Sequence, residues 1–466
     1  MVALGKLNLR AVDAASLILA AAAALIVLGV LKDLALLAVG RDLEIDTLID
    51  VLTLQSQTDS WMPMYRAVDF FRSTPDAGIY QTVFFEEQTK FQYPPTSLLP
   101  FLGLSVLGVD AELGYGLMNL LSILSLAGIL AATAKLALDQ ARAPGFAPFM
   151  ARPYATWMLM GGLIVCLLTF YPITYAYHLG QIQVQLDLAV CLAMLAWTKE
   201  RKGVAGALMA AAALVKPQYA LVFIWSLLRR EHQFTKGFAM LGVPAGLLSL
   251  LIFGIGEHFD YLEVIAFIGR HGEIYWTNQT MNGLLNRLLV DADAMTWDPN
   301  AFAPHHPLVY AGTLLSTLAL VLFALGYRPR WARAMKNDAT ADGAKDRESL
   351  LDLSTAIVAL TLASPIAWGH HYGVTWPIMV VTLMMLADLH ARRGDRLTLM
   401  LLVGLGASYF LVSNYLTQLF PFEAAPFNVL QSYVYAGGLG LLAVLVGARR
   451  ALDPTRGERT RTAAAA

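Results

Sequence analysis

Runs of about 20 predominantly apolar residues, the length that an α-helix needs to cross the hydrocarbon core of a bilayer, recur along most of the 466-residue chain. Hydrophobic residues make up 57% of the sequence and charged residues 14%, whereas soluble domains carry about 25% charged residues. A backbone inside lipid must satisfy its own hydrogen bonds. The sequence therefore predicts an all-α polytopic membrane protein.

Eleven apolar segments are candidates for membrane spans. They are residues 12–39, 112–134, 156–176, 182–198, 203–228, 237–256, 308–327, 350–368, 372–390, 397–415 and 430–448. Segment 203–228 has basic clusters at both ends, so we interpret it as a hairpin bent at Lys216 and Pro217 that returns to its starting side. This gives 12 crossings. Thirteen is the alternative, if the short segment 97–108 crosses instead of being re-entrant or interfacial.

Charge asymmetry predicts which loops face the cytoplasm. Lys and Arg cluster at 199–202, 229–236, 328–336, 392–396 and after 449, whereas residues 41–91 hold nine acids against four bases and residues 257–307 hold seven against two. By the positive-inside rule, the basic loops are cytoplasmic and the two acidic loops face outward. We expect residues 1–450 to form one transmembrane domain and residues 451–466 to form a disordered cytoplasmic tail.

Aromatic residues in the first acidic loop and just after it predict amphipathic helices lying in the membrane interface. They are Trp61, Tyr80, Phe84, Phe85 and Tyr93. In the stretch TDSWMPMYRA, Asp59 follows the first span and precedes Tyr65. An acid at the rim of the hydrocarbon is a candidate functional residue. The alternative is that Asp59 caps a helix in a solvated loop.

Two further candidates lie at the outer ends of spans. Gln181, in HLGQIQVQ, has an amide suited to hydroxyl-rich ligands, or alternatively to hydrogen bonds between spans. Lys216 lies at the bend of the hairpin with no other base around it. An ammonium at this depth is costly unless it meets an anion such as a phosphate, or extends to outer water.

The stretches NQTMNGLLNR and ASPIAWGHHYG supply the remaining polar candidates. The first contains Asn282 and Arg287, and the second contains Trp368, His370 and His371. Adjacent histidines point to different faces of a helix, so a two-His metal site on one face is not expected. With Arg287 they could donate hydrogen bonds to an anion at the membrane rim. Plain interfacial histidines are the alternative.

Several classes of protein are disfavoured by the sequence. A formal net charge of −1 gives no basic field for nucleic acid. The sequence contains no phosphate loop of the form GxxxxGK[ST], no HExxH and no GxSxG. We predict no metal site, although metal dependence is undetermined, because no spacing of the outer acids demands a divalent ion.

The ordered motifs resemble glycosyltransferase family 87, whose members have the GT-C membrane fold and use polyprenyl-phosphate sugars. The resemblance covers residues 50–380. It rests on DSWMPMYRA, on YPP at 93–95, on Gly180 and Gln181, on LVKPQ at 214–218, on the Asn-rich stretch before Arg287, and on SPIAWGHHY. The family pattern places the tyrosine closer to the acid than Tyr65 lies to Asp59.

The resemblance implies a donor such as polyprenyl-phosphate-mannose and a glycolipid or glycan acceptor, at the outer face of a bacterial-type inner membrane. It implies that Asp59 is the catalytic base and that the donor phosphate lies near Lys216, Arg287, His370 and His371. We place Tyr65, Tyr93, Gln181, Asn282 and Trp368 among the substrate-binding candidates. A direct displacement with one carboxylate predicts inversion. A transporter or flippase of lipid-linked sugars, or a polysaccharide ligase, is the alternative.

Overall fold

The computed structural model describes residues 31, 43–74, 77–298, 301–330 and 342–453. Across these residues the elements are helices, and one isolated β-bridge pairs Asn278 with Trp368. The α-helices are α2 (Leu43–Thr53), α3 (Trp61–Ser73), α4 (Leu99–Val106), α5 (Ala111–Gln140), α6 (Ala147–Met150), α7 (Ala155–Leu168), α8 (Tyr171–Leu179), α9 (Gln183–Thr198), α10 (Lys202–Ala213), α11 (Leu221–Arg229), α12 (His232–His271), α13 (Met281–Leu289), α14 (Pro307–Gly326), α16 (Asp342–Leu362), α17 (Thr375–Arg393), α18 (Arg396–Ser413) and α19 (Tyr433–Ala451). The short helical turns are η2 (Tyr80–Glu86), η3 (Pro95–Leu98), η4 (Pro144–Phe146), η5 (Pro217–Ala220), η7 (Gly369–Val374), η8 (Thr417–Leu419) and η9 (Phe427–Ser432).

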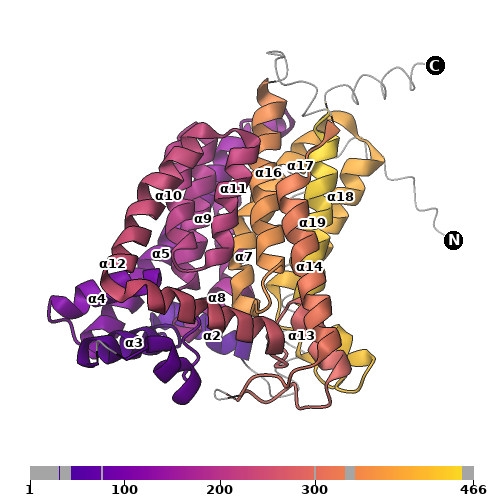
Figure 1. Ribbon diagram of the computed structural model, residues 1–466. Helices are drawn as coiled ribbons and strands as arrows, with labels where there is room; N and C mark the ends of the chain where they lie inside the picture. Colours follow the sequence, from indigo (N-terminus) through magenta and orange to yellow (C-terminus); the bar gives the residue numbers. More distant parts are fainter. Residues whose placement is uncertain (1–30, 32–42, 75–76, 299–300, 331–341, 454–466) are drawn as a thin grey trace.

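The long helices stand side by side as a bundle (Figure 1). Among the described residues, six helices are long and apolar enough to cross a membrane, or seven if Pro144–Met150 and Ala155–Leu168 form one bent span. The all-α polytopic prediction is confirmed. The count of 12 crossings stays a prediction, and the first predicted span, 12–39, lies outside the described residues apart from Leu31.

The predicted hairpin at 203–228 is present. The chain leaves helix at the end of α10, passes Lys216 and η5, and re-enters helix in α11. The two ends of the segment meet again, since Lys202 Nζ lies 3.1 Å from Glu231 Oε2. The rings of Trp197 and Trp225, whose centroids are 5.9 Å apart, pack beside this junction. Lys216 is therefore at the opposite end of the bundle from the basic loops.

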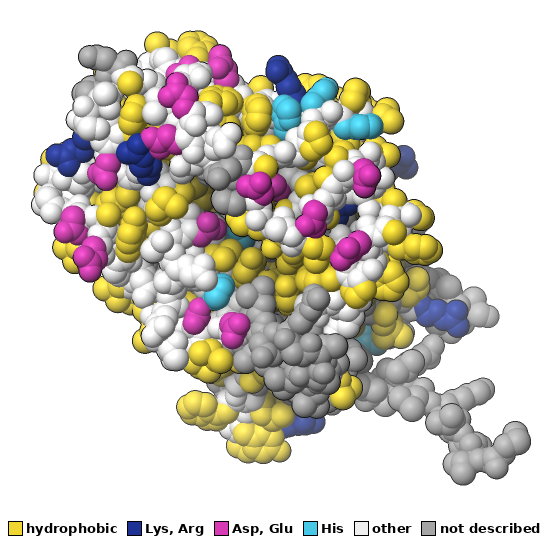
Figure 2. Space-filling model, turned by 90° about the horizontal axis from the view of Figure 1, so that it is seen from below, with side chains coloured by type: hydrophobic (Ala, Val, Ile, Leu, Met, Phe, Trp, Pro, Cys, Tyr) yellow, Lys and Arg dark blue, Asp and Glu magenta, His cyan; other side chains and the backbone are white. Residues whose placement is uncertain are grey.

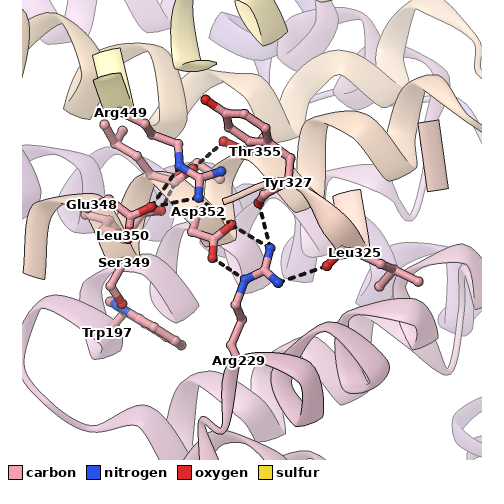
Figure 3. A network of polar contacts seen from close by, with 12 residues as sticks. Trp197, Arg229, Leu325, Tyr327, Glu348, Ser349, Leu350, Asp352, Thr355 and Arg449 are labelled. Carbon is pink, nitrogen blue, oxygen red and sulfur yellow. Dashed lines mark hydrogen bonds and ion pairs between the residues drawn. The ribbon is translucent and has the colours of Figure 1, made fainter. Parts of the chain in front are cut away.

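A buried charge network closes the basic end of the bundle (Figure 3). Arg449 of α19 is 2.7 Å from Glu348 Oε1 and 3.0 Å from Asp352 Oδ1 of α16. Arg229 of α11 is 2.5 Å from Asp352 Oδ2 and donates to the carbonyl oxygens of Leu325 and Tyr327. Because each buried charge faces an opposite charge, the network ties three helices together instead of leaving an unpaired ion. Helix α19 ends at Ala451. Of the predicted cytoplasmic tail, residues 454–466 lie outside the described part of the chain.

Helix α12 bends sharply at Gly254, whose φ of 79° and ψ of 164° suit only glycine. The bend separates an upright half from a second half that follows the lower end of the bundle (Figure 1). It matches the boundary that the sequence predicts between the span 237–256 and the outer loop. Helix α4 has eight residues and lies with α3 at that lower end. That segment 97–108 does not cross stays a prediction.

The aromatic residues of the first acidic loop mostly pack inside the protein, whereas the sequence predicts that they face the membrane interface. Trp61, Tyr80 and Phe84 are at most 3% exposed. Tyr80 packs on Tyr261 and Phe84 on Phe267, both from the second half of α12. Seen from below, this end of the molecule shows Asp and Glu side chains in greater number than Lys and Arg (Figure 2).

Candidate functional site

A cavity of about 550 Å³ lies where the Asp59 loop, the break at Lys216 and the turn η7 meet. This volume is within the range of small-molecule sites. Seven of the ten residues that the sequence nominates line it, and they are Asp59, Tyr93, Gln181, Lys216, Trp368, His370 and His371. The structure thus gathers into one space residues that lie more than 300 positions apart in the chain.

Backbone hydrogen bonds join the loop that contains Asp59 to the end of α8. The backbone N–H of Gln57 donates to the His178 carbonyl at 2.8 Å, and that of Asp59 donates to the Leu179 carbonyl at 2.9 Å. Gly180 ends α8 with a φ of +68°, and a Cβ there would lie 1.9 Å from the Gln57 carbonyl oxygen. Only glycine allows both this backbone conformation and this approach. These contacts fix the position of the Asp59 backbone and so help to place its carboxylate.

Within the described residues, the polar partner of the Asp59 carboxylate is the amide of Gln181, whose Nε2 donates to Asp59 Oδ2. The orientation of that amide is set by Ser60, whose hydroxyl donates to Gln181 Oε1 at 2.7 Å and lies 2.8 Å from the Tyr93 hydroxyl. Burial raises the pKa of Asp59 above the ordinary aspartate value, and the Gln181 hydrogen bond offsets part of the rise. A raised pKa makes the carboxylate a stronger base than an ordinary aspartate.

Lys216 is buried, and its ammonium is held by a second glutamine. Lys216 Nζ donates to Gln183 Oε1 at 2.6 Å, and Gln183 Nε2 donates to Asp187 Oδ1 at 2.6 Å. Gln183 and Asp187 are one helical turn apart at the start of α9, so they lie on the same face. The result is a buried ammonium, amide and carboxylate in series, with the ammonium on the cavity wall.

His370 and His371 reach the cavity from η7. Their ring centroids are 4.6 Å apart and the ring planes are nearly perpendicular. The Nδ1 atoms of both rings are buried and have no hydrogen-bond partner in the described part of the chain. Trp368 and Tyr175 pack around His370. Two imidazoles with unused nitrogen atoms can donate to, or accept from, a bound ligand.

A second charged pair at the cavity has no sequence signal. Lys90 Nζ lies 3.0 Å from Glu273 Oε2 and sits 3.8 Å from the centre of the Trp297 ring. Lys90 and Trp297 both line the cavity. Burial raises the pKa of Glu273 to about 7, although the Lys90 ammonium opposes the rise. Each residue is isolated in an ordinary loop sequence, so only the fold reveals the pair.

Three nominated residues lie away from the cavity and contact protein instead. Arg287 is 3% exposed and its guanidinium donates to the Asn278 carbonyl and to Ser432 Oγ. Asn282 donates to Thr313 Oγ1 and accepts from the Glu273 backbone. Tyr65 packs edge-on against Phe101 and Tyr115. All three side chains therefore stabilise the structure around the site, and none of them lines the cavity.

Asp187 is a buried acid that is not among the site residues predicted from the sequence. It lies within the predicted span 182–198, where a carboxylate is a strong functional signal, and four residues after Gln183, where a helix brings the two together. Among the described residues, no group of three or more His, Cys, Asp and Glu side chains is arranged to hold a metal ion.

The bundle and its cavity define an integral membrane protein with a carboxylate, a buried ammonium and a wall of neutral polar and aromatic side chains in one site. Residues 91–344, more than half of the chain, match the model of glycosyltransferase family 87, and the chain belongs to that family. It is a membrane glycosyltransferase. No curated protein and no solved structure matches the chain. Asp59, His370 and His371 lie outside the matched residues, so their roles rest on the geometry.

Proposed function

We propose that this glycosyltransferase moves a hexose, with mannose as the first candidate, from a polyprenyl-phosphate sugar to a hydroxyl group of a glycolipid or glycan acceptor. The observation that carries the proposal is the presence of Asp59 and Lys216 on the walls of one cavity. A transfer from a lipid phosphate requires a base for the incoming hydroxyl and a cation for the departing phosphate. These two residues supply the two groups.

The reaction proceeds as a single displacement. The acceptor oxygen forms a bond to the anomeric carbon and its proton passes to the Asp59 carboxylate. The bond between the anomeric carbon and the phosphate oxygen breaks, and the electron pair leaves with the polyprenyl phosphate. Lys216 and the imidazoles of His370 and His371, which line the same cavity, stabilise this charge as it develops, which lowers the transition state more than the ground state. Attack from the face opposite the phosphate inverts the anomeric configuration.

Lipid and water both have access to such a site at the rim of a membrane. Apolar side chains from α11, α14 and α16 line the cavity together with Lys216, among them Leu221, Val321 and Leu360. They suit an isoprenoid chain. Gln88, in the first acidic loop, and Gln92, just after it, line the same cavity and suit a hydroxyl-rich acceptor. We place the reaction at the outer face of a bacterial-type inner membrane, because the basic loops lie at the opposite end of the bundle.

Transfer by the purified protein tests the proposal directly. With radiolabelled polyprenyl-phosphate-mannose and a glycolipid acceptor extract, Asp59→Asn should lower the transfer rate by about 100-fold or more, since loss of a general base costs a factor of that order. Asp69→Asn is the matched control, because Asp69 lies on the exposed face of α3 in the same loop. Equal rates for wild type and Asp59→Asn would reject Asp59 as the base.

The same preparation separates a transferase from a transporter. In liposomes, a flippase would move the labelled lipid between leaflets without forming a new glycoside. Flipping without transfer by the wild-type protein would overturn the proposed function. The anomeric configuration of the product, read by NMR, tests inversion in the same assay.

A further inference from the structure

Asp187 lies between the residue that holds Lys216 and the turn that carries the histidines. Its side chain is fully buried, and Oδ1 accepts from Gln183, which in turn accepts from Lys216. On the other side, a Cβ at Gly373 of η7 would lie 2.0 Å from Asp187 Oδ2. The carboxylate therefore packs directly against the backbone that follows His370 and His371. Its Oδ2 atom has no hydrogen-bond partner among the described residues.

The charges around Lys216 change during the proposed reaction. An ammonium and a carboxylate joined through one amide are neutral as a unit. A sugar phosphodiester adds one negative charge, and the polyprenyl phosphate product is a monoester that adds about 1.5 to 2 at neutral pH. In surroundings of low dielectric constant, each added negative charge is repelled by the Asp187 carboxylate as well as attracted by Lys216. The repulsion is greatest for the product.

We infer that Asp187 is a positioning residue that competes with the lipid phosphate for Lys216 and thereby drives release of the polyprenyl phosphate product. The inference rests on the proposed function. Between turnovers, Gln183 and Asp187 hold the Lys216 ammonium, so that no unpaired cation is buried. The donor phosphate displaces part of this hold. After transfer, the more highly charged product faces the same carboxylate and leaves, and Lys216 returns to Gln183.

Removing the charge of Asp187 tests the inference. Asparagine keeps an oxygen that can accept from Gln183, so Asp187→Asn removes the repulsion and preserves the shape. The variant should bind the product about tenfold more tightly, as expected for the loss of one nearby like charge. The inhibition constant of polyprenyl phosphate should fall by that factor, and donor KM and kcat should fall together because release slows.

Asp388→Asn is the matched control. Asp388 is also a fully buried carboxylate in a helix, but it pairs with Arg347 and Arg392 at the basic end and does not line the cavity. We expect this variant to lose thermal stability without a change in the product inhibition constant. If Asp187 had only a structural role, Asp187→Asn would also lose thermal stability without tighter product binding. A raised donor KM or an unchanged product inhibition constant in Asp187→Asn would overturn the inference.

A second variant keeps the test decisive if Asp187→Asn does not fold. Gln183→Met removes both hydrogen bonds that join Asp187 to Lys216 and should also tighten product binding. Binding of polyprenyl phosphate can be measured by the shift in melting temperature in detergent. This measurement distinguishes failure of the proposed function from failure of the role inferred for Asp187. No binding by the wild-type protein would overturn the proposed function. Binding by the wild type that both variants leave unchanged or weaken would overturn the role of Asp187 alone.

Discussion

Gln181 and Gln183 are two residues apart, yet their amides serve opposite charges. Gln181 presents its nitrogen to the Asp59 carboxylate, whereas Gln183 presents its oxygen to the Lys216 ammonium. Each orientation is fixed by a further contact, with Ser60 in the first case and with Asp187 in the second. A neutral amide can adapt to either sign in this way without bringing a net charge into a buried site. One short stretch thus positions both reacting ends of the site.

The acid limb of the pH–rate profile should report the Gln181 contact. Asp59 must be ionised to accept a proton, and the hydrogen bond from Gln181 favours the ionised form. In Gln181→Leu the pKa of Asp59 should rise further, which moves the acid limb of kcat/KM upward by about one pH unit. Activity should therefore fall most at mildly acidic pH and least at alkaline pH.

Gln185→Leu is the control for this experiment. Gln185 lies four residues further along the chain, in the first turn of α9, but it donates to Ser122 Oγ and is not among the residues that line the cavity. Its acid limb should coincide with that of the wild type. An unchanged limb in Gln181→Leu would show that the amide does not tune Asp59 during catalysis.

The sequence predicts single residues well where lipid makes a polar group costly. Asp59, Lys216 and the paired histidines stand out for this reason, and the structure brings them to one cavity. Arg287 and Asn282 carry the same signal, but their polar groups are used by backbone carbonyls and by Thr313. A sequence does not distinguish a polar group that faces a ligand from one that satisfies the fold. Only the positions of neighbouring chains decide between them.

At the scale of the elements, two glycine residues determine how the helices and loops around the site are arranged. Gly180 allows the Asp59 loop to lie against the end of α8, and Gly254 turns the second half of α12 along the lower end of the bundle. The turned half brings Tyr261, Ile265 and Ile268 to the cavity wall. Helix breaks thus position three walls of the site, at Gly180, at Gly254 and at Lys216.

Substitution of Gly254 should strain α12 without adding a clash. No atom of the described residues lies within 4 Å of a Cβ built at this position. The cost therefore comes from the backbone conformation, and such strain is of order 1–3 kcal/mol. Gly254→Ala should lower the melting temperature and raise donor KM, because the cavity wall shifts. Gly246→Ala, in the upright half of the same helix and equally free of contacts, should be neutral or slightly stabilising. Equal effects of the two substitutions would contradict a positioning role for the bend.

Hydropathy and charge predict the element order because they act locally. The hairpin at 203–228 follows from basic clusters at its two ends, and the contact between Lys202 and Glu231 confirms it. The burial of the loop aromatics does not follow. Rings such as Tyr80 and Phe84 suit a membrane interface and a protein interior equally well. The second half of α12, which covers them, is distant in the sequence.

The whole molecule has two ends with different electrostatics. The basic end is closed by paired charges, as in the network of Arg229, Asp352, Glu348 and Arg449 (Figure 3). At the other end, Asp59, Lys216, His370 and His371 line a cavity, and the Nδ1 atoms of the two histidines have no hydrogen-bond partner in the described part of the chain. Closed networks stabilise a fold, whereas unsatisfied buried groups beside a cavity indicate a ligand. This contrast supports the proposed position of the reaction at the end of the bundle that contains the cavity.

An experimental structure with a bound, non-reactive polyprenyl-phosphate sugar analogue tests the central claim most directly. The account predicts density for the phosphate within hydrogen-bond distance of Lys216 Nζ and of an imidazole of His370 or His371. It places the sugar between that phosphate and the Asp59 carboxylate. A phosphate bound elsewhere, or a sugar whose anomeric carbon faces away from Asp59, would contradict the account.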